Sequence, residues 1–237
     1  IGYTYFEDDD KWGISDFACD FIFIGDKNIN FEIPGTLGIV QDYFAWIKKE
    51  KERHYPEINV EQYLDGVKLH PQLNILYMTM SKINKDVIDK LKKDSNIVLL
   101  IDTDNAHGMS EQRRLFIELL ESNCKTPVII GRKYENISNE EFQLYSATDI
   151  GGLFVDGLGD GIFLTKKGPS SLEQRNKISF GILQASRTRI SKTEYISCPS
   201  CGRTLFDLQE TTALIRSKTQ HLKGLKIGIM GCIVNGP

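Results

Sequence analysis

The stretch Asn96-Ile-Val-Leu-Leu-Ile101 decides the fold of this chain. It is a continuous apolar run, which is typical of a strand that is buried on both faces of a parallel sheet. Two similar runs lie on either side of it, Leu73-Asn-Ile-Leu-Tyr-Met-Thr-Met80 and Thr126-Pro-Val-Ile-Ile130. The segments between them carry apolar residues at helical spacing. Because parallel neighbours need helical crossovers, this alternation predicts an α/β fold with a parallel sheet covered by helices, open or barrel-like.

The same alternation extends in both directions along the chain, less regularly over the first 70 residues. The expected elements are a strand at 21–24, a strand or loop at 31–40, a helix at 41–53, helices after Ser81 and Ser110, a helix at 139–147, strands at 152–155 and 161–164, and a helix at 171–189. Repeated strand–helix units of this kind are compatible with an open sheet and with a barrel-like one.

The end of the chain repeats the pattern once more. We expect a strand at 193–197, a helix that opens at Thr204 and reaches about 220, and a strand at 225–230. The weakest join lies at 190–193. The sequence therefore predicts two domains, a barrel-like domain at 1–190 and the start of a second α/β domain at 191–237.

Composition excludes several classes of protein. The 237 residues carry a net charge of -3, which argues against a general binder of nucleic acids or membrane surfaces. No apolar run approaches the roughly 20 residues of a transmembrane helix. The chain starts at Ile1 without Met and stops just past a Gly- and Pro-rich turn. We therefore expect it to be a segment of a longer protein.

Three of the five cysteines lie in the predicted second domain. Cys198 and Cys201 follow one predicted strand, and Cys232 follows another. Parallel pairing of these strands would bring all three thiols to one edge of the sheet. Cys19 and Cys124 lie in apolar surroundings, where buried free thiols are expected.

Three interpretations of the cysteines are open on spacing alone. The Cys-x-x-Cys pair can be a redox or incidental pair with Cys232 in the core. The three thiols can bind zinc, with His221 completing a Cys₃His site. They can also hold an iron–sulfur cluster that leaves one iron for another ligand.

Two motifs distinguish between these interpretations. Cys198-Pro-Ser-Cys-Gly-Arg-Thr204 and Gly231-Cys-Ile-Val-Asn-Gly-Pro237 together resemble the 4-hydroxy-3-methylbut-2-enyl diphosphate synthases. Asp156-Gly-Leu-Gly-Asp160 and Phe180-Gly-Ile-Leu-Gln-Ala185 are also similar to that family. The earlier residues look like the extra middle domain of its large, three-domain members, which occur in plants and some bacteria. This resemblance implies an α/β fold with a partial TIM-barrel-like middle domain, followed by the start of an α/β iron–sulfur domain.

The resemblance implies an iron–sulfur oxidoreductase of the non-mevalonate isoprenoid pathway. Such enzymes reductively open 2-C-methyl-D-erythritol 2,4-cyclodiphosphate with electrons from flavodoxin or ferredoxin. By resemblance, Cys198, Cys201 and Cys232 ligate a [4Fe–4S] cluster, and a glutamate beyond Pro237 is the fourth ligand. Arg203 and Asn235 are candidates for hydrogen bonds to the cluster or substrate.

The resemblance also carries expectations for the chain as it stands. The middle domain is expected to be structural, and the segment alone is expected to be inactive and to hold its cluster poorly or not at all. A bacterial cytoplasmic location is expected, or the plastid stroma for a plant-type protein. The alternative function is a zinc-binding or scaffolding module without catalysis.

A further polar group follows the strand that ends at Ile101. Asp102, Asp104 and His107 lie where α/β folds place active groups, and an acid–His pair can do acid–base chemistry. Loop residues that cap the next helix have the same pattern. We favour the capping interpretation.

Overall fold

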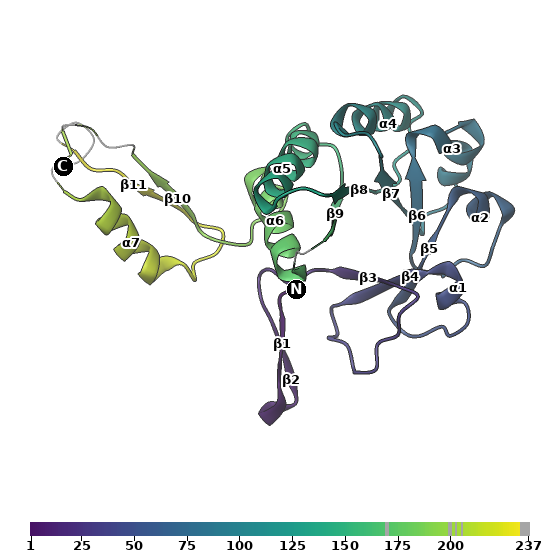
Figure 1. Ribbon diagram of the computed structural model, residues 1–237, viewed down its shortest axis with the longest axis horizontal. Coiled ribbons are helices and arrows are strands. Elements are labelled where there is room, and N and C mark those ends of the chain that lie inside the picture. The colour runs from purple at the N-terminus through teal and green to yellow at the C-terminus, as the bar shows by residue number, and fades with distance from the viewer. Residues whose placement is uncertain (169–170, 199–200, 202, 205, 233–237) are drawn as a thin grey trace. The chain divides into compact units, whose positions relative to one another are not determined.

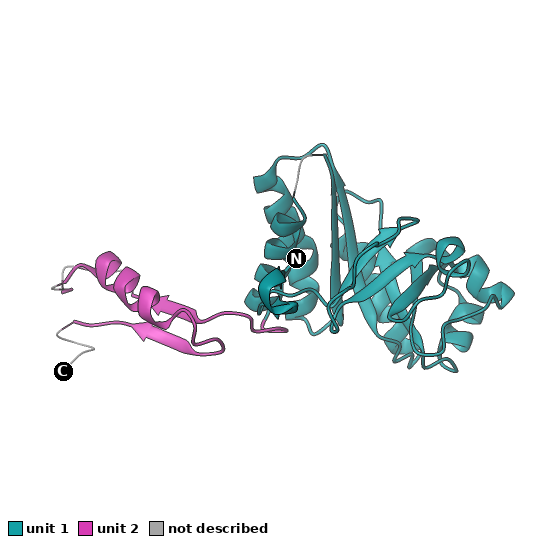
Figure 2. Ribbon diagram, turned by 90° about the horizontal axis from the view of Figure 1, so that it is seen from below, with its two compact units in different colours: residues 1–186 teal, residues 187–237 magenta. Residues whose placement is uncertain are grey.

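The computed structural model describes residues 1–168, 171–198, 201, 203–204 and 206–232 (Figure 1). The chain divides into two compact units, unit 1 at residues 1–186 and unit 2 at residues 187–237 (Figure 2). Among the described residues, no helix is both long and apolar enough to cross a membrane.

Unit 1 is built on a parallel sheet of seven strands that pair in sequence order. The strands are β3 (Phe21–Gly25), β4 (Gly38–Asp42), β5 (His54–Ile58), β6 (Asn74–Thr79), β7 (Ile97–Asp102), β8 (Val128–Glu135) and β9 (Gly161–Lys167). The helices are α1 (Tyr43–Trp46), α2 (Val60–Asp65), α3 (Lys85–Leu91), α4 (Met109–Glu121), α5 (Asn139–Val155) and α6 (Leu172–Ala185). The sheet curls like half of a barrel, and the helices cover its outer side (Figure 1). The predicted α/β, partial-barrel fold is confirmed.

Side chains of this sheet form two apolar layers. Leu99 belongs to the large core between the strands and the helices, and Leu100 to a smaller group that includes Val40 and Ile75. Consecutive residues of a strand point to opposite faces, so the smaller group lies on the inner side of the curl. There the rings of Phe23 and Phe163, from the two edge strands, lie 6.2 Å apart between centroids. Burial on both faces explains why the central strands are apolar throughout.

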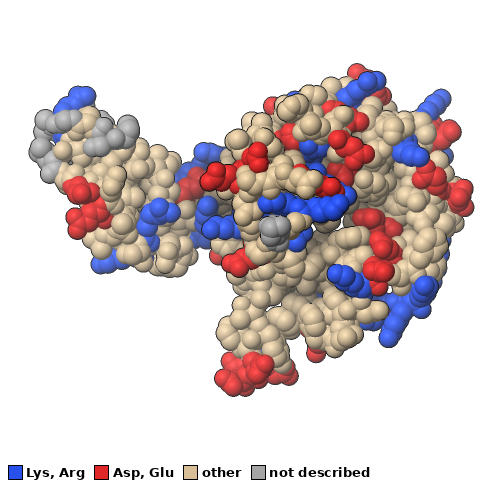
Figure 3. Space-filling model, viewed as in Figure 1, with Lys and Arg blue, Asp and Glu red and all other residues tan. Residues whose placement is uncertain are grey.

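An antiparallel hairpin precedes the sheet. Strands β1 (Tyr3–Phe6) and β2 (Lys11–Ile14) pair, and a short 3₁₀ helix at Glu7–Asp9 joins them. The acidic residues of this turn form the red tip of the hairpin in Figure 3. The hairpin, β5 and α2 are elements that the sequence pattern did not predict.

Unit 2 is a single β-α-β motif. Strands β10 (Glu194–Ser197) and β11 (Lys226–Ile229) are parallel, and helix α7 (Leu208–Thr219) connects them. Both predicted strands are confirmed. The predicted start of the helix is wrong, because its N-cap is Asp207 and not Thr204.

Several predicted boundaries in unit 1 are also wrong. Residues 152–155 were expected to form a strand, but α5 continues to Val155. A Cβ on Gly152 would lie only 2.8 Å from the sulfur of Met109, so the glycine allows α4 and α5 to approach closely. This contact depends on a residue about 40 positions away, and the local pattern does not contain it.

The other helix boundaries differ by smaller amounts. The helix that was expected at 171–189 ends at Ala185, and α1 covers only 43–46 of the expected 41–53. Helix α4 begins at Met109 with Gly108 as its N-cap, where Ser110 was expected. Helix ends depend on local capping, which sequence patterns locate poorly.

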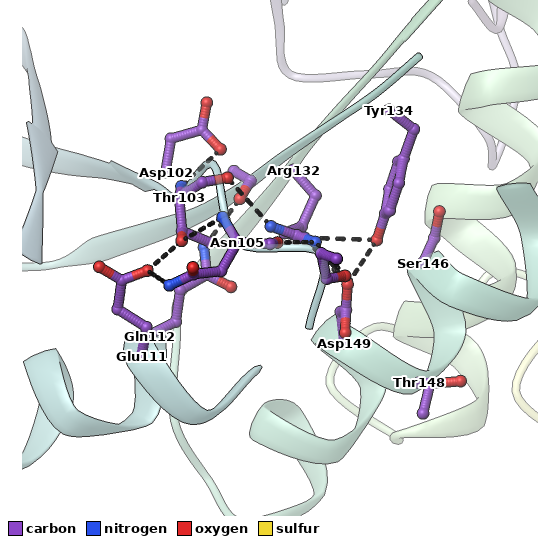
Figure 4. A network of polar contacts seen from close by, with 12 residues as sticks. Asp102, Thr103, Asn105, Glu111, Gln112, Arg132, Tyr134, Ser146, Thr148 and Asp149 are labelled. Carbon is purple, nitrogen blue, oxygen red and sulfur yellow. Dashed lines mark hydrogen bonds and ion pairs between the residues drawn. The ribbon is translucent and has the colours of Figure 1, made fainter. Parts of the chain in front are cut away.

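A buried polar network ties the ends of β7 and β8 to α5 (Figure 4). The guanidinium of Arg132 pairs with Asp149 at 2.9 Å, and both side chains are buried, with exposed fractions of 2% and 9%. Arg132 also donates to the carbonyl oxygen of Thr103 at 3.0 Å. The hydroxyl of Tyr134 donates to Asp149 at 2.9 Å. The network therefore holds the loop after β7 against the helix layer.

Replacing Asp149 with Asn is expected to lower the free energy of unfolding by about 3 to 5 kcal/mol, because it leaves the Arg132 charge buried without its partner. Urea denaturation followed by circular dichroism measures the change. The matched control is Glu50→Gln at the exposed Lys68–Glu50 pair, where a loss below about 1 kcal/mol is expected. Similar decreases in the free energy of unfolding at both sites would contradict the prediction, because the Arg132–Asp149 pair would then behave like a solvated one.

The inner side of the curl carries carboxylates at the carboxyl ends of the strands. Asp42 of β4 and Glu57 of β5 are register partners. Burial, assisted by the nearby Asp42 charge, raises the pKa of Glu57 to about 7 from its ordinary value of 4.5. The folded protein therefore keeps a proton on Glu57 that the unfolded chain releases between these two values.

The free energy of unfolding should then decrease as the pH rises from about 4.5 to about 7, and this contribution should level off above that range. Glu57→Gln removes the titration, so its stability relative to the native sequence should be greater at pH 8 than at pH 5, by at most about 3 kcal/mol. Denaturation across this pH range measures both slopes. Parallel slopes would contradict the prediction.

Candidate metal centre

Pairing of the two strands in unit 2 brings two cysteine segments together. Ser197 of β10 is the register partner of Ile229 of β11. The next residue, Cys198, donates its backbone N–H to the carbonyl oxygen of Ile229 at 3.2 Å. Cys232 lies three residues beyond Ile229 on the neighbouring strand. Both thiols are therefore at the carboxyl end of the same small sheet, and both are half-buried.

A tight turn places the third thiol close to the start of α7. The backbone N–H of Thr204 donates to the carbonyl oxygen of Cys201 at 2.9 Å, which closes the turn. Hydrogen bonds from the backbone and then the side chain of Arg203, with a contribution from Thr204, lower the pKa of the exposed Cys201 thiol. Thr204 therefore stabilises the cysteine turn, whereas the sequence pattern had placed it at the start of the helix.

Helix α7 points its N-terminus toward this end of unit 2. The Asp207 side chain accepts a hydrogen bond from the backbone N–H of Glu210 at 2.8 Å. The pattern Asp207-Leu-Gln-Glu210 is itself a capping signal that could have located the helix start. At the far end, the Thr193 hydroxyl donates to the carbonyl oxygen of Leu222 at 2.7 Å. The N-terminus of α7, which is the positive end of the helix dipole, therefore lies at the end of the sheet where the cysteines follow the strands.

A hollow of about 610 Å³ opens beside Cys198. Its walls are the end of β10 and one face of α7, and they include Phe206 and Arg216. The guanidinium carbon of Arg216 lies 5.2 Å from the ring centroid of Tyr195. Phe206 and Arg216 were not among the residues predicted from sequence.

The donor set fits an iron–sulfur cluster in its chemistry. The three thiols, two of them at one end of the sheet and the third, Cys201, with a lowered pKa, are soft ligands of the kind that such clusters use. Among the described residues, no three His, Cys, Asp or Glu side chains lie close enough together to hold a single metal ion. A [4Fe–4S] cluster binds each thiolate through a different iron, so its ligands need not meet at one point.

The structure does not place the other predicted residues beside the three cysteines. Asn235 lies outside the described residues. His221 follows the C-terminal end of α7, and the 12 residues of this helix span about 18 Å from the Asp207 end. Cys124 is buried as expected, whereas Cys19 at the base of the hairpin is only half-buried.

The family model for the GcpE protein C-terminal domain matches residues 194–237. The chain is 42% identical to the 4-hydroxy-3-methylbut-2-en-1-yl diphosphate synthase (flavodoxin) of Parabacteroides distasonis, over 92% of this chain and 35% of that protein. The synthase of the same name from Bacteroides thetaiotaomicron is 47% identical over 70% of this chain and 27% of its own length. The one from Leptospira interrogans is 49% identical over 59% of this chain and 20% of its own length.

These matches extend well beyond the cysteine motifs. The Parabacteroides protein aligns over 218 residues, which includes most of unit 1. The chain spans about a third of the length of the curated relatives that match it over more than nine tenths of its residues. The predicted resemblance is therefore confirmed for both units.

The exposure and lowered pKa of Cys201 predict high reactivity in metal-free protein. Iodoacetamide at pH 7 should alkylate Cys201 at least about tenfold faster than the buried Cys124, because the thiolate is the nucleophile. A mass-spectrometric time course measures both rates. Urea-unfolded protein is the control, in which the two rates should converge. Equal rates in the folded protein would contradict the prediction.

Proposed function

Because this chain belongs to the 4-hydroxy-3-methylbut-2-en-1-yl diphosphate synthase family, we propose that it is part of an enzyme with that activity. The enzyme would reductively open 2-C-methyl-D-erythritol 2,4-cyclodiphosphate to 4-hydroxy-3-methylbut-2-enyl diphosphate. The relatives carry flavodoxin in their names, which supports flavodoxin as the electron donor. We assign the activity to the longer protein, because the chain spans about a third of the length of these relatives.

Within this proposal, Cys198, Cys201 and Cys232 hold a [4Fe–4S] cluster. The observation that carries it is the parallel pairing of β10 with β11, which brings the Cys-x-x-Cys turn and the Cys232 segment to one edge. Bound there, the cluster would supply one-electron transfer and Lewis acidity.

The chain's own residues prepare this edge for an anionic cluster. Arg203 and Thr204 donate hydrogen bonds toward the Cys201 sulfur, which favours its thiolate form. The N-terminus of α7, capped by Asp207, adds positive potential from the helix dipole. The open hollow beside Cys198 leaves room for a small molecule to approach this thiol.

The position of His221 favours the cluster over a Cys₃His zinc site. The imidazole follows the end of α7 that is remote from the cysteine turn, and a zinc ion needs all four ligands within bonding distance of one atom. A solvated histidine near a helix C-terminus accounts for this residue.

We also propose a structural role for unit 1. The polar residues at the end of β7 and in the loop after it are engaged in local contacts, although none of them caps α4, whose N-cap Gly108 has no side-chain cap hydrogen bond. Asp102 accepts from the backbone N–H of Thr103 at 2.8 Å, and the side chain of Asn105 donates to Glu111 of α4 at 2.6 Å. The second of these contacts ties the loop after β7 to the first turn of α4.

Anaerobic reconstitution of the full-length protein with ferrous iron and sulfide tests the cluster assignment. We expect a brown protein with about four irons per chain. Cys232→Ser should lose most of the iron because it removes a ligand, whereas Cys124→Ser should keep it and serves as the control. A colourless protein with one zinc per chain would contradict the proposal and favour the zinc module.

A further inference from the structure

The side chain of Phe206 lies between the two cysteine segments. A Cβ atom placed on Gly231 would be 3.1 Å from Cε1 and 3.5 Å from Cζ of this ring, so the ring edge packs directly on the Gly231 backbone. Gly231 immediately precedes Cys232. The same ring lines the hollow beside Cys198. One side chain therefore touches the segment of one proposed ligand and shares a cavity wall with another.

This contact is not the usual packing at the start of a helix. Phe206 precedes the N-cap Asp207, and an apolar residue at that position commonly packs on the fourth residue of its own helix. That residue is Thr211, which is polar, whereas the contact described here is with Gly231 from the other cysteine segment. The ring remains 40% exposed, so it is not a buried core residue.

The neighbouring glycine makes the contact possible. Any side chain at position 231 would press against the ring at a distance tighter than ordinary van der Waals contact. With glycine there, the flat ring and the backbone fit together, and the segment leading to Cys232 has a fixed surface to rest on.

We propose that Phe206 is a positioning residue that sets the place of Cys232 relative to Cys198 and Cys201 and shields the metal centre from water. This inference rests on the proposed function, because the centre it positions is the proposed [4Fe–4S] cluster. Groups that orient ligands from outside the coordination shell typically change metal affinity or activity by about 10- to 100-fold. The apolar surroundings of a cluster also contribute to its reduction potential, through solvent exposure.

The test uses the anaerobically reconstituted full-length protein and three variants. Phe206→Ala removes the ring, Phe206→Tyr keeps it, and Leu214→Ala is the matched control, because Leu214 is an apolar residue of α7 that is 58% exposed. The measurements are the rate of iron loss to a chelator and the midpoint potential of the cluster.

Phe206→Ala should lose iron about tenfold faster than the native protein. Its midpoint potential should become more positive, because water reaching the cluster stabilises the charge added on reduction. Phe206→Tyr should restore both values, and Leu214→Ala should leave both unchanged. Identical iron loss and potential in Phe206→Ala and Leu214→Ala would overturn the proposal while leaving the cluster assignment intact.

A second measurement works without metal. In metal-free protein treated with diamide, which accepts the two electrons and two protons that a pair of thiols loses, Cys232 should form a disulfide with Cys198 or Cys201, and Phe206→Ala should slow its formation. Peptide mapping by mass spectrometry identifies the bonded pairs. If the native protein binds no iron–sulfur cluster but the disulfide rates differ as expected, the proposed function fails and the positioning role stands. Equal rates, or no disulfide in the native protein, would overturn the positioning role.

Discussion

Parallel pairing of β10 with β11 is the interaction on which the proposed metal centre depends. Strands that run in the same direction end at the same edge, so the residues that follow them become neighbours even when they are far apart in sequence. Here the hydrogen bond from Cys198 to Ile229 links segments about 30 residues apart. Helix α7 is the crossover that such pairing requires, and its N-terminus arrives at the same edge.

Unit 1 uses the same geometry on a larger scale. Its seven parallel strands also deliver polar groups to one edge, but the structure engages several of them in local contacts. Arg132 is paired with Asp149 and bound to the loop after β7, and Asp102 caps the Thr103 amide. The strand ends of unit 2 differ because their thiols remain free of such partners among the described hydrogen bonds, apart from the contacts that favour the Cys201 thiolate.

Contacts around the cysteines show how a small motif can prepare a site. The Cys201 turn, the Asp207 cap and the Phe206 ring occupy seven consecutive residues of the chain, 201–207. The turn contains the Cys201 thiol, and the Asp207 cap stabilises the N-terminus of α7. The Phe206 ring contacts Gly231 on the other cysteine segment. A change in any of these would alter the surroundings of the proposed metal centre without removing one of its three proposed cysteine ligands.

Much of this arrangement was readable in the amino-acid order. The apolar runs at 73–80, 96–101 and 126–130 indicated buried parallel strands, and the positions of Cys198 and Cys232 after two strands indicated a shared edge. These predictions succeed because a buried strand and a helical crossover each leave a recognisable pattern of apolar residues in a short stretch of sequence. Other features depend on partners distant in sequence, and local patterns do not contain them. Gly152 of α5 lies close to Met109 of α4, Phe206 contacts Gly231 of the other cysteine segment, and Arg132 pairs with Asp149 of α5. Only the tertiary structure decides these contacts, because they form when two segments that are distant in sequence pack together. Packing removes both side chains from water, so each must then fit or pair with the other.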